Sequence, residues 1–167
     1  MKTLLILRHA KSSLKDPNIA DHERPSDELA KKDALQMGKL LRDRGLIPDF
    51  ILSSTAVRAK TTAELVAEGC KYKGDIVLEQ SLYKAKPKDY SKIIEGLSDK
   101  YVSILLVGHN PAVEEAIEMF TGLLDITMSA CALAHLNIPI EKWSDLKQGK
   151  NNIRAELIEV MKPEELS

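Results

Sequence analysis

The sequence predicts a single-domain α/β protein, in which helices cover both faces of a mainly parallel central sheet in a layered α/β/α arrangement. Apolar runs of strand length alternate with segments of helical period along the chain, as in parallel strands joined by helices. The clearest of these runs are apolar throughout, as expected for strands that are buried on both faces. A chain of 167 residues that is 44% hydrophobic can bury one sizeable core, so we expect residues 1–167 to form one domain.

Six segments are expected to be strands, four of them in the parallel part of the sheet. These four are Thr3–Leu7, Phe50–Leu52, Ile76–Leu78 and Val102–Val107. The later extended runs Ala130–Ile138 and Ile153–Val160 are predicted to form an antiparallel edge. Trp143 lies between these two runs and is expected to pack in the core or in a loop.

Helices are predicted between the strands, at residues 26–44, 57–68, 87–97 and 111–120. Ser26 or Asp27 can cap the first helix, and Gly45 can end it. Its helical spacing is carried by Leu29, Ala30, Ala34, Met37, Leu40 and Leu41. The polar residues 11–24 come before this helix and are expected to form an ordered loop or lid.

Composition excludes several classes of protein. The chain has 24 Lys and Arg against 25 Asp and Glu, a net charge of −1, which argues against a strongly basic nucleic-acid binder. The N-terminal apolar run is interrupted by Arg8, and it is too short for a signal peptide or a membrane span. Cys70 and Cys131 have no metal-ligand spacing and are expected to be reduced and semi-buried, which favours a cytoplasmic location.

Polar residues with a shared character follow three of the predicted strands. Arg8-His9 follows the first strand, Ser53-Ser54-Thr55 follows the second with Arg58 close behind, and Gly108-His109-Asn110 follows the fourth. Because ligands of open α/β sheets bind beyond the carboxyl ends of the strands, these side chains should converge at one edge. A single histidine after a strand is usually a structural hydrogen-bonding group, and Arg58 alone would be a surface residue. The occurrence of such residues after three strands together favours a functional site.

The charges around His9 suit an anion. Arg8 and Lys11 disfavour protonation of the imidazole, which pushes His9 toward its neutral, nucleophilic form. Asn110-Pro111 is expected to supply a helix cap and a first-turn proline beside His109. A helix N-terminus at that point offers free N–H groups and partial positive charge, which fit a phosphate.

These motifs resemble those of the histidine phosphatase superfamily, also called the phosphoglycerate-mutase-like superfamily. The segments "RHAKSS", "ERP" and "GHNP", with Arg58 in "SSTAVRAKTTAE", resemble in particular the small, single-domain phosphohistidine phosphatases of the SixA type. The similarity spans residues 4 to about 120. The usual first motif of the superfamily is Arg-His-Gly, and this chain has Ala10 in the third place.

The resemblance implies a role for each residue of the site. His9 would be the nucleophile that carries a transient phosphohistidine, Arg8 and Arg58 would bind the phosphoryl oxygens, and His109 would contact the same oxygens. No metal or other cofactor is implied, because protein side chains supply the charge. Arg24 is a further candidate for phosphate binding, with an ion pair to Asp21 or Glu23 as the alternative.

Some neighbouring residues are more simply explained as solvent-exposed or structural. Lys11 and Ser12 can line the mouth of the site, although loop residues in solvent explain them as well. His22 and His135 are expected to be structural or exposed.

A proton donor is missing from the place where the superfamily often has one. Relatives that cleave alcohol phosphates tend to have a carboxylic acid after the third strand, where this chain has "LEQSLYKAKPKDY". Glu79 and Asp89 are the only acids there, and neither is convincingly placed. An alkoxide needs a proton to leave, whereas the imidazole of a phosphohistidine leaves readily, so the sequence favours a phosphohistidine substrate. The lysines of this stretch, Lys84, Lys86 and Lys88, are either a solvated face or a docking patch for an acidic phosphoprotein such as a phosphorelay domain.

Three other functions were weighed against a phosphohistidine phosphatase. A broad-specificity phosphomonoesterase would act on small phosphorylated molecules with the same residues. A non-catalytic phosphoprotein-binding module would have little need to keep His9. A doubly wound nucleotide-binding protein is disfavoured, because the first strand is not followed by a glycine-rich loop.

Overall fold

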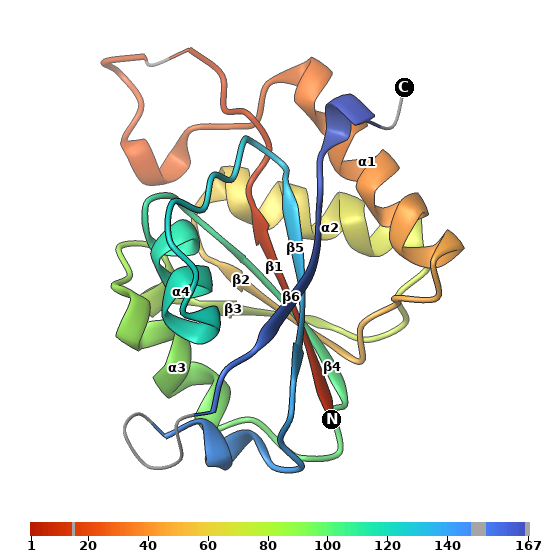
Figure 1. The fold of residues 1–167 in the computed structure, drawn as a ribbon. Helices are drawn as coiled ribbons and strands as arrows, with labels where there is room; N and C mark the ends of the chain where they lie inside the picture. The colour runs from red at the N-terminus through yellow and green to blue at the C-terminus, as the bar shows by residue number, and fades with distance from the viewer. Residues whose placement is uncertain (15, 148–152, 166–167) are drawn as a thin grey trace.

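A computed structural model describes residues 1–14, 16–147 and 153–165 of the chain. Its six strands form one sheet in the order β3-β2-β4-β1-β5-β6 (Figure 1). The strands are β1 (Lys2–Arg8), β2 (Phe50–Ser54), β3 (Ile76–Glu79), β4 (Ser103–Gly108), β5 (Leu133–Ile138) and β6 (Glu156–Met161). Strands β1 to β4 pair in parallel, and β5 pairs antiparallel with both β1 and β6. The predicted α/β fold with a mainly parallel sheet is therefore confirmed.

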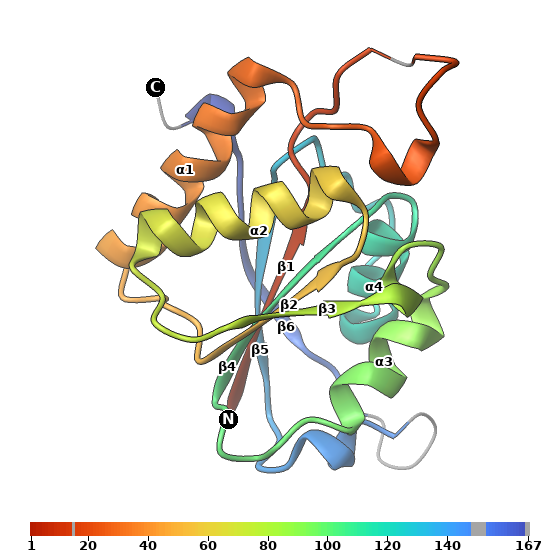
Figure 2. The ribbon, with the colours of Figure 1, turned by 180° about the vertical axis from the view of Figure 1, so that it is seen from behind.

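Four α-helices cover the two faces of the sheet. They are α1 (Glu28–Asp43), α2 (Val57–Cys70), α3 (Pro87–Glu95) and α4 (Ala112–Thr121). Helices α1 and α2 lie on one face, and α3 and α4 lie on the other (Figures 1 and 2). Each face has its own buried apolar cluster, because β1 and β4 point alternate side chains to opposite sides. The result is the three-layer arrangement expected from the sequence.

The segment before α1 contains a short 3-10 helix, η1 (Asp21–Glu23). The two ends of this segment, rather than of η1, are joined by an antiparallel bridge between Ser12 and Ser26. Asp27 caps α1 by accepting a hydrogen bond from the Leu29 N–H at 2.8 Å. Gly45 ends the helix region with a φ of +68°, in the left-handed region that glycine adopts easily.

Three details of the predicted elements differ from the structure. Leu29 is 72% exposed, because it lies in the first turn of α1 on the side away from the sheet. The Asn110 side chain does not cap α4, since its amide donates to the Met128 carbonyl, and Pro111 occupies the N-cap position itself. The predicted antiparallel pair is present, but β5 lies inside the sheet between β1 and β6, so of these two strands only β6 is at an edge. Trp143 is fully buried, as expected.

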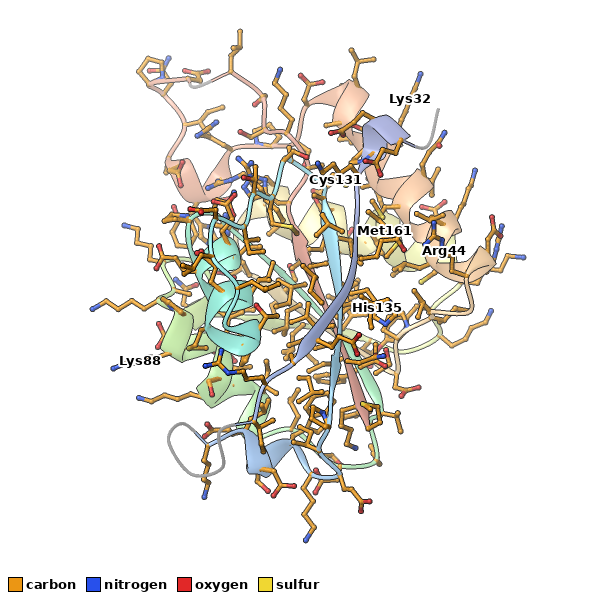
Figure 3. The ribbon with its side chains drawn as sticks, in the orientation of Figure 1. Lys32, Arg44, Lys88, Cys131, His135 and Met161 are labelled. Atoms are coloured by element: carbon orange, nitrogen blue, oxygen red, sulfur yellow. The ribbon has the colours of Figure 1, made fainter. Side chains whose placement is uncertain are left out.

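No helix within residues 1–14, 16–147 and 153–165 combines the length and the apolar character needed to cross a bilayer. Both cysteines are free thiols and both are buried. Figure 3 shows how the side chains are distributed, with Lys88 on α3 and Arg44 at the end of α1 on opposite sides of the molecule. The Arg44 guanidinium forms an ion pair with Glu159 on β6.

Helices α1 and α2 pack closely through two glycines. A Cβ atom built on Gly38 would overlap the Val66 carbonyl oxygen and lie 2.9 Å from Gly69 Cα. The atoms in the way are backbone atoms, so a side chain at Gly38 can be accommodated only by moving one helix away from the other. This contact matters for the site, because α2 carries Arg58 in its first turn.

We predict that Gly38→Ala lowers the free energy of unfolding by about 1–3 kcal/mol, as overpacking of a tight core does. Urea unfolding followed by circular dichroism measures the change. Gly96→Ala is the matched control, because a Cβ there makes only ordinary contacts, 3.7 Å to the Ile93 carbonyl oxygen and 4.0 Å to that of Lys92. Equal stability of the two variants would contradict this description of the α1–α2 contact.

Candidate active site

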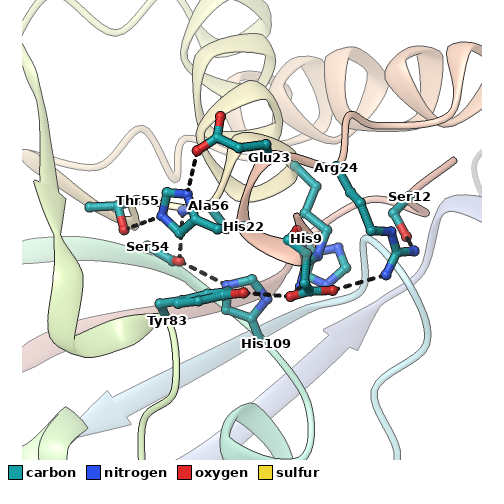
Figure 4. Close-up of polar contacts among 12 residues, drawn as sticks. His9, Ser12, His22, Glu23, Arg24, Ser54, Thr55, Ala56, Tyr83 and His109 are labelled. Atoms are coloured by element: carbon teal, nitrogen blue, oxygen red, sulfur yellow. Dashed lines mark hydrogen bonds and ion pairs between the residues drawn. The ribbon is translucent and has the colours of Figure 1, made fainter. Parts of the chain in front are cut away.

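The site begins where β1 and β4 end side by side. These strands pair in parallel with Arg8 opposite Gly108, so the next residues, His9 and His109, leave the sheet at the same level. The His9 N–H continues the pairing by donating to the Gly108 carbonyl at 3.1 Å. The two imidazole rings lie with their centroids 4.9 Å apart (Figure 4). His9 is 9% exposed and His109 is 8% exposed.

The His9 ring is held in one tautomer by the next residue. His9 Nδ1 lies 2.7 Å from the Ala10 carbonyl oxygen, which can only accept a hydrogen bond. Nδ1 must therefore carry the proton, and in the neutral ring the lone pair is on Nε2. The Ala10 N–H donates to Thr62 Oγ1 on α2 at 2.9 Å, which anchors the residue whose carbonyl orients His9.

Ala10 fits its position without special backbone geometry. It is not among the described residues with positive φ, and its methyl group is buried in the cluster beneath α1 and α2. The position does not require the left-handed conformation that favours glycine.

Both histidines are held neutral. Burial lowers the pKa of His9 to about 4, and the positive charges of Arg58, Arg8 and Arg24 add to this effect. Burial also lowers the pKa of His109 to about 3, with further contributions from His9 and Arg58. At neutral pH the site therefore contains two uncharged imidazoles beside arginine side chains.

Strand β2 supplies the partner of His109. The Ser54 hydroxyl oxygen lies 2.8 Å from His109 Nε2 and accepts a hydrogen bond from the Ala56 N–H at 3.2 Å (Figure 4). The other ring nitrogen, His109 Nδ1, is buried and has no hydrogen-bond partner among the described residues. His109 thus keeps one buried ring nitrogen without a partner in the described part of the chain.

The arginines approach the histidines from three elements. Arg8 is anchored at the end of β1 by a hydrogen bond of 3.0 Å to the Met128 carbonyl. Arg58, in the first turn of α2, is 8% exposed and donates to both the backbone and the side chain of Asp21. Arg24 donates to Ser12 Oγ at 2.6 Å and forms an ion pair with Asp21 at 3.0 Å. The expected ion pair of Arg24 is therefore present, and its charge still reaches His9.

The sequence named Asp21 only as a possible ion-pair partner of Arg24 and His22 only as structural or exposed, and it did not single out Tyr83. Asp21, from η1, accepts hydrogen bonds from Arg24, Arg58 and the Tyr83 hydroxyl. The Tyr83 ring lies edge-on to His109 with centroids 5.6 Å apart and to His22 with centroids 4.8 Å apart. His22 is half-buried and is bonded to Glu23 and Thr55 (Figure 4).

Other candidates have no contact with the two histidines. Glu79 accepts hydrogen bonds from the N–H and hydroxyl of Ser81, and Asp89 accepts from the Lys86 N–H, so both acids cap local structure. His135 lies on β5 opposite Leu5 in the sheet. The lysines between η2 (Gln80–Leu82) and the start of α3 are exposed, and they are Lys84, Lys86 and Lys88.

The described ranges contain no group of three or more His, Cys, Asp or Glu side chains arranged to hold a metal ion. Because both imidazoles are neutral, the positive charge of the site comes from the guanidinium ions of Arg8, Arg24 and Arg58. Planar guanidinium groups are well suited to bind the oxygens of a phosphoryl group.

Comparisons with known proteins show which sequences and folds this chain resembles. No protein-family model matches the chain. An uncharacterised chloroplastic protein of Arabidopsis thaliana is 28% identical over 86% of this chain and 70% of its own length. An uncharacterised protein of Mycobacterium leprae is 32% identical over 70% of this chain and 71% of its own length.

A solved structure from Agrobacterium tumefaciens, assigned as the phosphohistidine phosphatase SixA, superposes with a TM-score of 0.82 at 28% identity, over 97% of this chain and 98% of that one. The chain belongs to the histidine phosphatase superfamily. The protein histidine phosphatase SixA complexed with tungstate has the same fold, with a TM-score of 0.84 at 18% identity over 99% of both chains. A mycobacterial glucosyl-3-phosphoglycerate phosphatase shares the fold more distantly, with a TM-score of 0.67 at 14% identity over 94% of this chain and 97% of that one.

The low pKa values of the two histidines predict a pH-dependent stability. An unfolded histidine binds a proton near pH 6.5, whereas His9 and His109 stay neutral in the fold until about pH 4 and 3. The unfolded state therefore binds more protons between these limits, so stability is complete above about pH 6.5 and is lost as the pH falls. We expect a loss on the order of 1 kcal/mol for each histidine at pH 5.5 relative to pH 7.5.

Urea unfolding at pH 7.5 and 5.5 measures this loss in the wild type and in His109→Gln. The variant should lose less stability between the two pH values, because one of the two buried imidazoles is absent. Burial lowers the pKa of His135 in the same direction, and that contribution is common to both proteins. Identical pH dependence in the two proteins would contradict the assignment of a neutral, buried His109.

Proposed function

We propose that this member of the histidine phosphatase superfamily hydrolyses phosphohistidine, on a phosphoprotein, through a covalent phosphohistidine intermediate on His9. The observation that carries the proposal is the state of His9: neutral, with Nδ1–H fixed on the Ala10 carbonyl and the lone pair on Nε2. An uncharged nucleophile beside arginine side chains is suited to attack an anionic phosphoryl group. The proposal takes residues 1–167 as one phosphatase domain.

The first half of the reaction transfers the phosphoryl group to His9. Nε2 of His9 forms a bond to phosphorus as the P–N bond of the substrate breaks. The substrate ring carries a proton on its other nitrogen, so it takes the electron pair and leaves as neutral imidazole. Arg8 and Arg58 bind the phosphoryl oxygens, and Arg24 adds positive charge at the rim. In the second half a water attacks the phosphorus of phospho-His9, which releases inorganic phosphate and restores neutral His9.

His109 is positioned by Ser54 to donate to a phosphoryl oxygen. The Ser54 oxygen already accepts from the Ala56 N–H, so its hydroxyl proton is free to point at His109 Nε2. That arrangement leaves the proton of the neutral His109 ring on Nδ1, the buried atom without a partner. A donor in place before the reaction stabilises charge in the transition state without reorganisation.

The substrate class follows from the acids near the site. Glu79 is engaged with Ser81 and faces no reacting group. Asp21 does lie in the site, but hydrogen bonds from Tyr83, Arg58 and Arg24 hold the pKa of its carboxyl well below the usual range, so it is ionised and cannot donate a proton. Without a proton donor an alcohol phosphate is cleaved slowly, whereas an imidazole is a good leaving group.

Two other functions are alternatives for this chain. A broad-specificity phosphomonoesterase of small molecules is the main alternative, since the structural neighbours include a glucosyl-3-phosphoglycerate phosphatase. A non-catalytic phosphoprotein-binding module would not need the fixed tautomer of His9. Lys84, Lys86 and Lys88 support a phosphoprotein partner such as a phosphorelay domain, because they are exposed and Lys84 lies over the Tyr83 ring at the site. A cytoplasmic location remains a prediction from the sequence.

We predict that His9→Ala reduces the hydrolysis of a phosphohistidine-containing protein by about 10³-fold or more, because the nucleophile is gone. Release of inorganic phosphate measures the rate. His135→Ala is the matched control, a half-buried histidine outside the site, and should keep the wild-type rate. Labelled wild-type protein, denatured at alkaline pH where phosphohistidine survives, should carry its label on His9. Label on another residue would refute the mechanism.

We also predict that kcat/KM for phosphohistidine exceeds that for alkyl phosphates by about 10²–10⁴, the range that general-acid help typically supplies. Assays of a phosphohistidine protein, a sugar phosphate and phosphoglycerate side by side measure the ratio. Glu79→Gln should change neither rate, because that side chain caps η2. Equal turnover of the alkyl phosphates, lost in Glu79→Gln, would instead identify a small-molecule phosphomonoesterase.

A further inference from the structure

The carboxylate of Asp21 lies in a position that is built for an anion. Its Oδ1 accepts from Arg24 at 3.0 Å, and its Oδ2 accepts from Arg58 at 3.1 Å and from the Tyr83 hydroxyl at 2.6 Å. The donors come from three parts of the chain: the segment before α1, the first turn of α2, and the residues after β3. Three convergent donors on one carboxylate form an oxyanion site, occupied here by the protein itself.

This oxyanion site borders the two histidines. Arg58 and Arg24 both lower the pKa of His9 through their charges, and the Tyr83 ring contacts the His109 ring. Asp21 itself acts on His109 in the opposite sense, which places its negative charge near that ring. In Figure 4 Tyr83 and Arg24 flank His9 and His109, and a dashed line from each marks its bond to the carboxylate.

A surface ion pair of ordinary kind does not account for these contacts. Asp21 engages Arg58 twice, since Nη1 donates to its backbone carbonyl at 2.8 Å while Nη2 donates to the carboxylate. The Arg58 side chain is only 10% exposed, whereas that of Asp21 is 50% exposed. The buried guanidinium is therefore satisfied by a residue that lies at the solvent side, which is also the side from which a substrate must arrive.

We propose that Asp21 is an internal competitor for the phosphoryl group: its carboxylate occupies donors of Arg58 and Arg24 that phosphoryl oxygens take over when substrate binds. This inference rests on the proposed function, because it assigns those arginines to phosphoryl binding. The carboxylate keeps Arg58 ordered and neutralised in the free protein, and it raises the concentration of phosphate needed to fill the site. A bound dianion repels the carboxylate, so Asp21 leaves its position as the anion enters.

The test is the affinity of the protein for inorganic phosphate and for tungstate, measured by isothermal titration calorimetry at pH 7.5. Asp21→Asn removes the charge and keeps the shape of the side chain. We expect Asp21→Asn to bind both anions about tenfold more tightly than the wild type, since charge-assisted hydrogen bonds to the competing carboxylate are weakened. Asp21→Ala should show a gain of the same sign.

Glu23→Gln is the matched control, because it removes one negative charge from the same turn and its side chain bonds His22 rather than an arginine. It should change the affinity much less than Asp21→Asn does. An equal gain in anion affinity in Asp21→Asn and Glu23→Gln would show that only the net charge matters, and would overturn the proposal. Weaker binding in Asp21→Asn and Asp21→Ala, with thermal unfolding like that of the wild type, would show instead that Asp21 only positions the arginines.

The same titrations separate this inference from the proposed function. Wild-type protein that binds phosphate and turns over phosphohistidine, with no gain in the Asp21 variants, refutes the competitor and leaves the phosphatase standing. Wild-type protein and Asp21 variants that all bind neither phosphate nor tungstate at millimolar concentration refute both, because the arginines then form no phosphoryl site.

Discussion

The parallel register of β1 and β4 is the constraint on which the site depends. Arg8 pairs with Gly108, and the His9 N–H bonds the Gly108 carbonyl, so the residues that follow the two strands emerge together. The apolar side chains of β1 and β4 are buried on both faces of the sheet. They stabilise this register, because a shift by one residue would move every side chain to the opposite face. The rigid part of the fold thus places two imidazoles side by side, and the surrounding loops need only supply charge.

Burial and positive charge then determine what those imidazoles can do. Both effects disfavour protonation, and together they keep His9 and His109 neutral at neutral pH. Backbone and hydroxyl groups determine the tautomers: the Ala10 carbonyl accepts a hydrogen bond from the Nδ1–H of His9, and Ser54 faces Nε2 of His109. Nearby arginines that would repel an imidazolium are at the same time the groups that attract a phosphoryl anion. One arrangement therefore serves both the nucleophile and its substrate.

The elements of the fold and the clustering of Arg8, His9, Arg58 and His109 could be predicted because they depend on short-range signals. Apolar runs mark the strands, and polar residues directly after parallel strands must meet at one edge. The contact between Asp21 and Tyr83 was missed because it joins residues 62 positions apart through two irregular segments, whose course no periodicity encodes. The cap expected from Asn110 was wrong for a similar reason: the distant carbonyl of Met128 competes for its amide. Local rules failed where a long-range hydrogen bond replaced a local one.

The central claim is that His9 is a neutral imidazole with its proton on Nδ1 and its lone pair on Nε2. Long-range ¹H–¹⁵N correlation spectra of the labelled protein report the protonation of each ring nitrogen, and His9→Gln assigns the signals. We expect His9 at pH 7 to show a protonated Nδ1 and an unprotonated Nε2, and to keep this pattern down to about pH 5. A His9 that titrates near pH 6.5, or that carries its proton on Nε2, would contradict the claim.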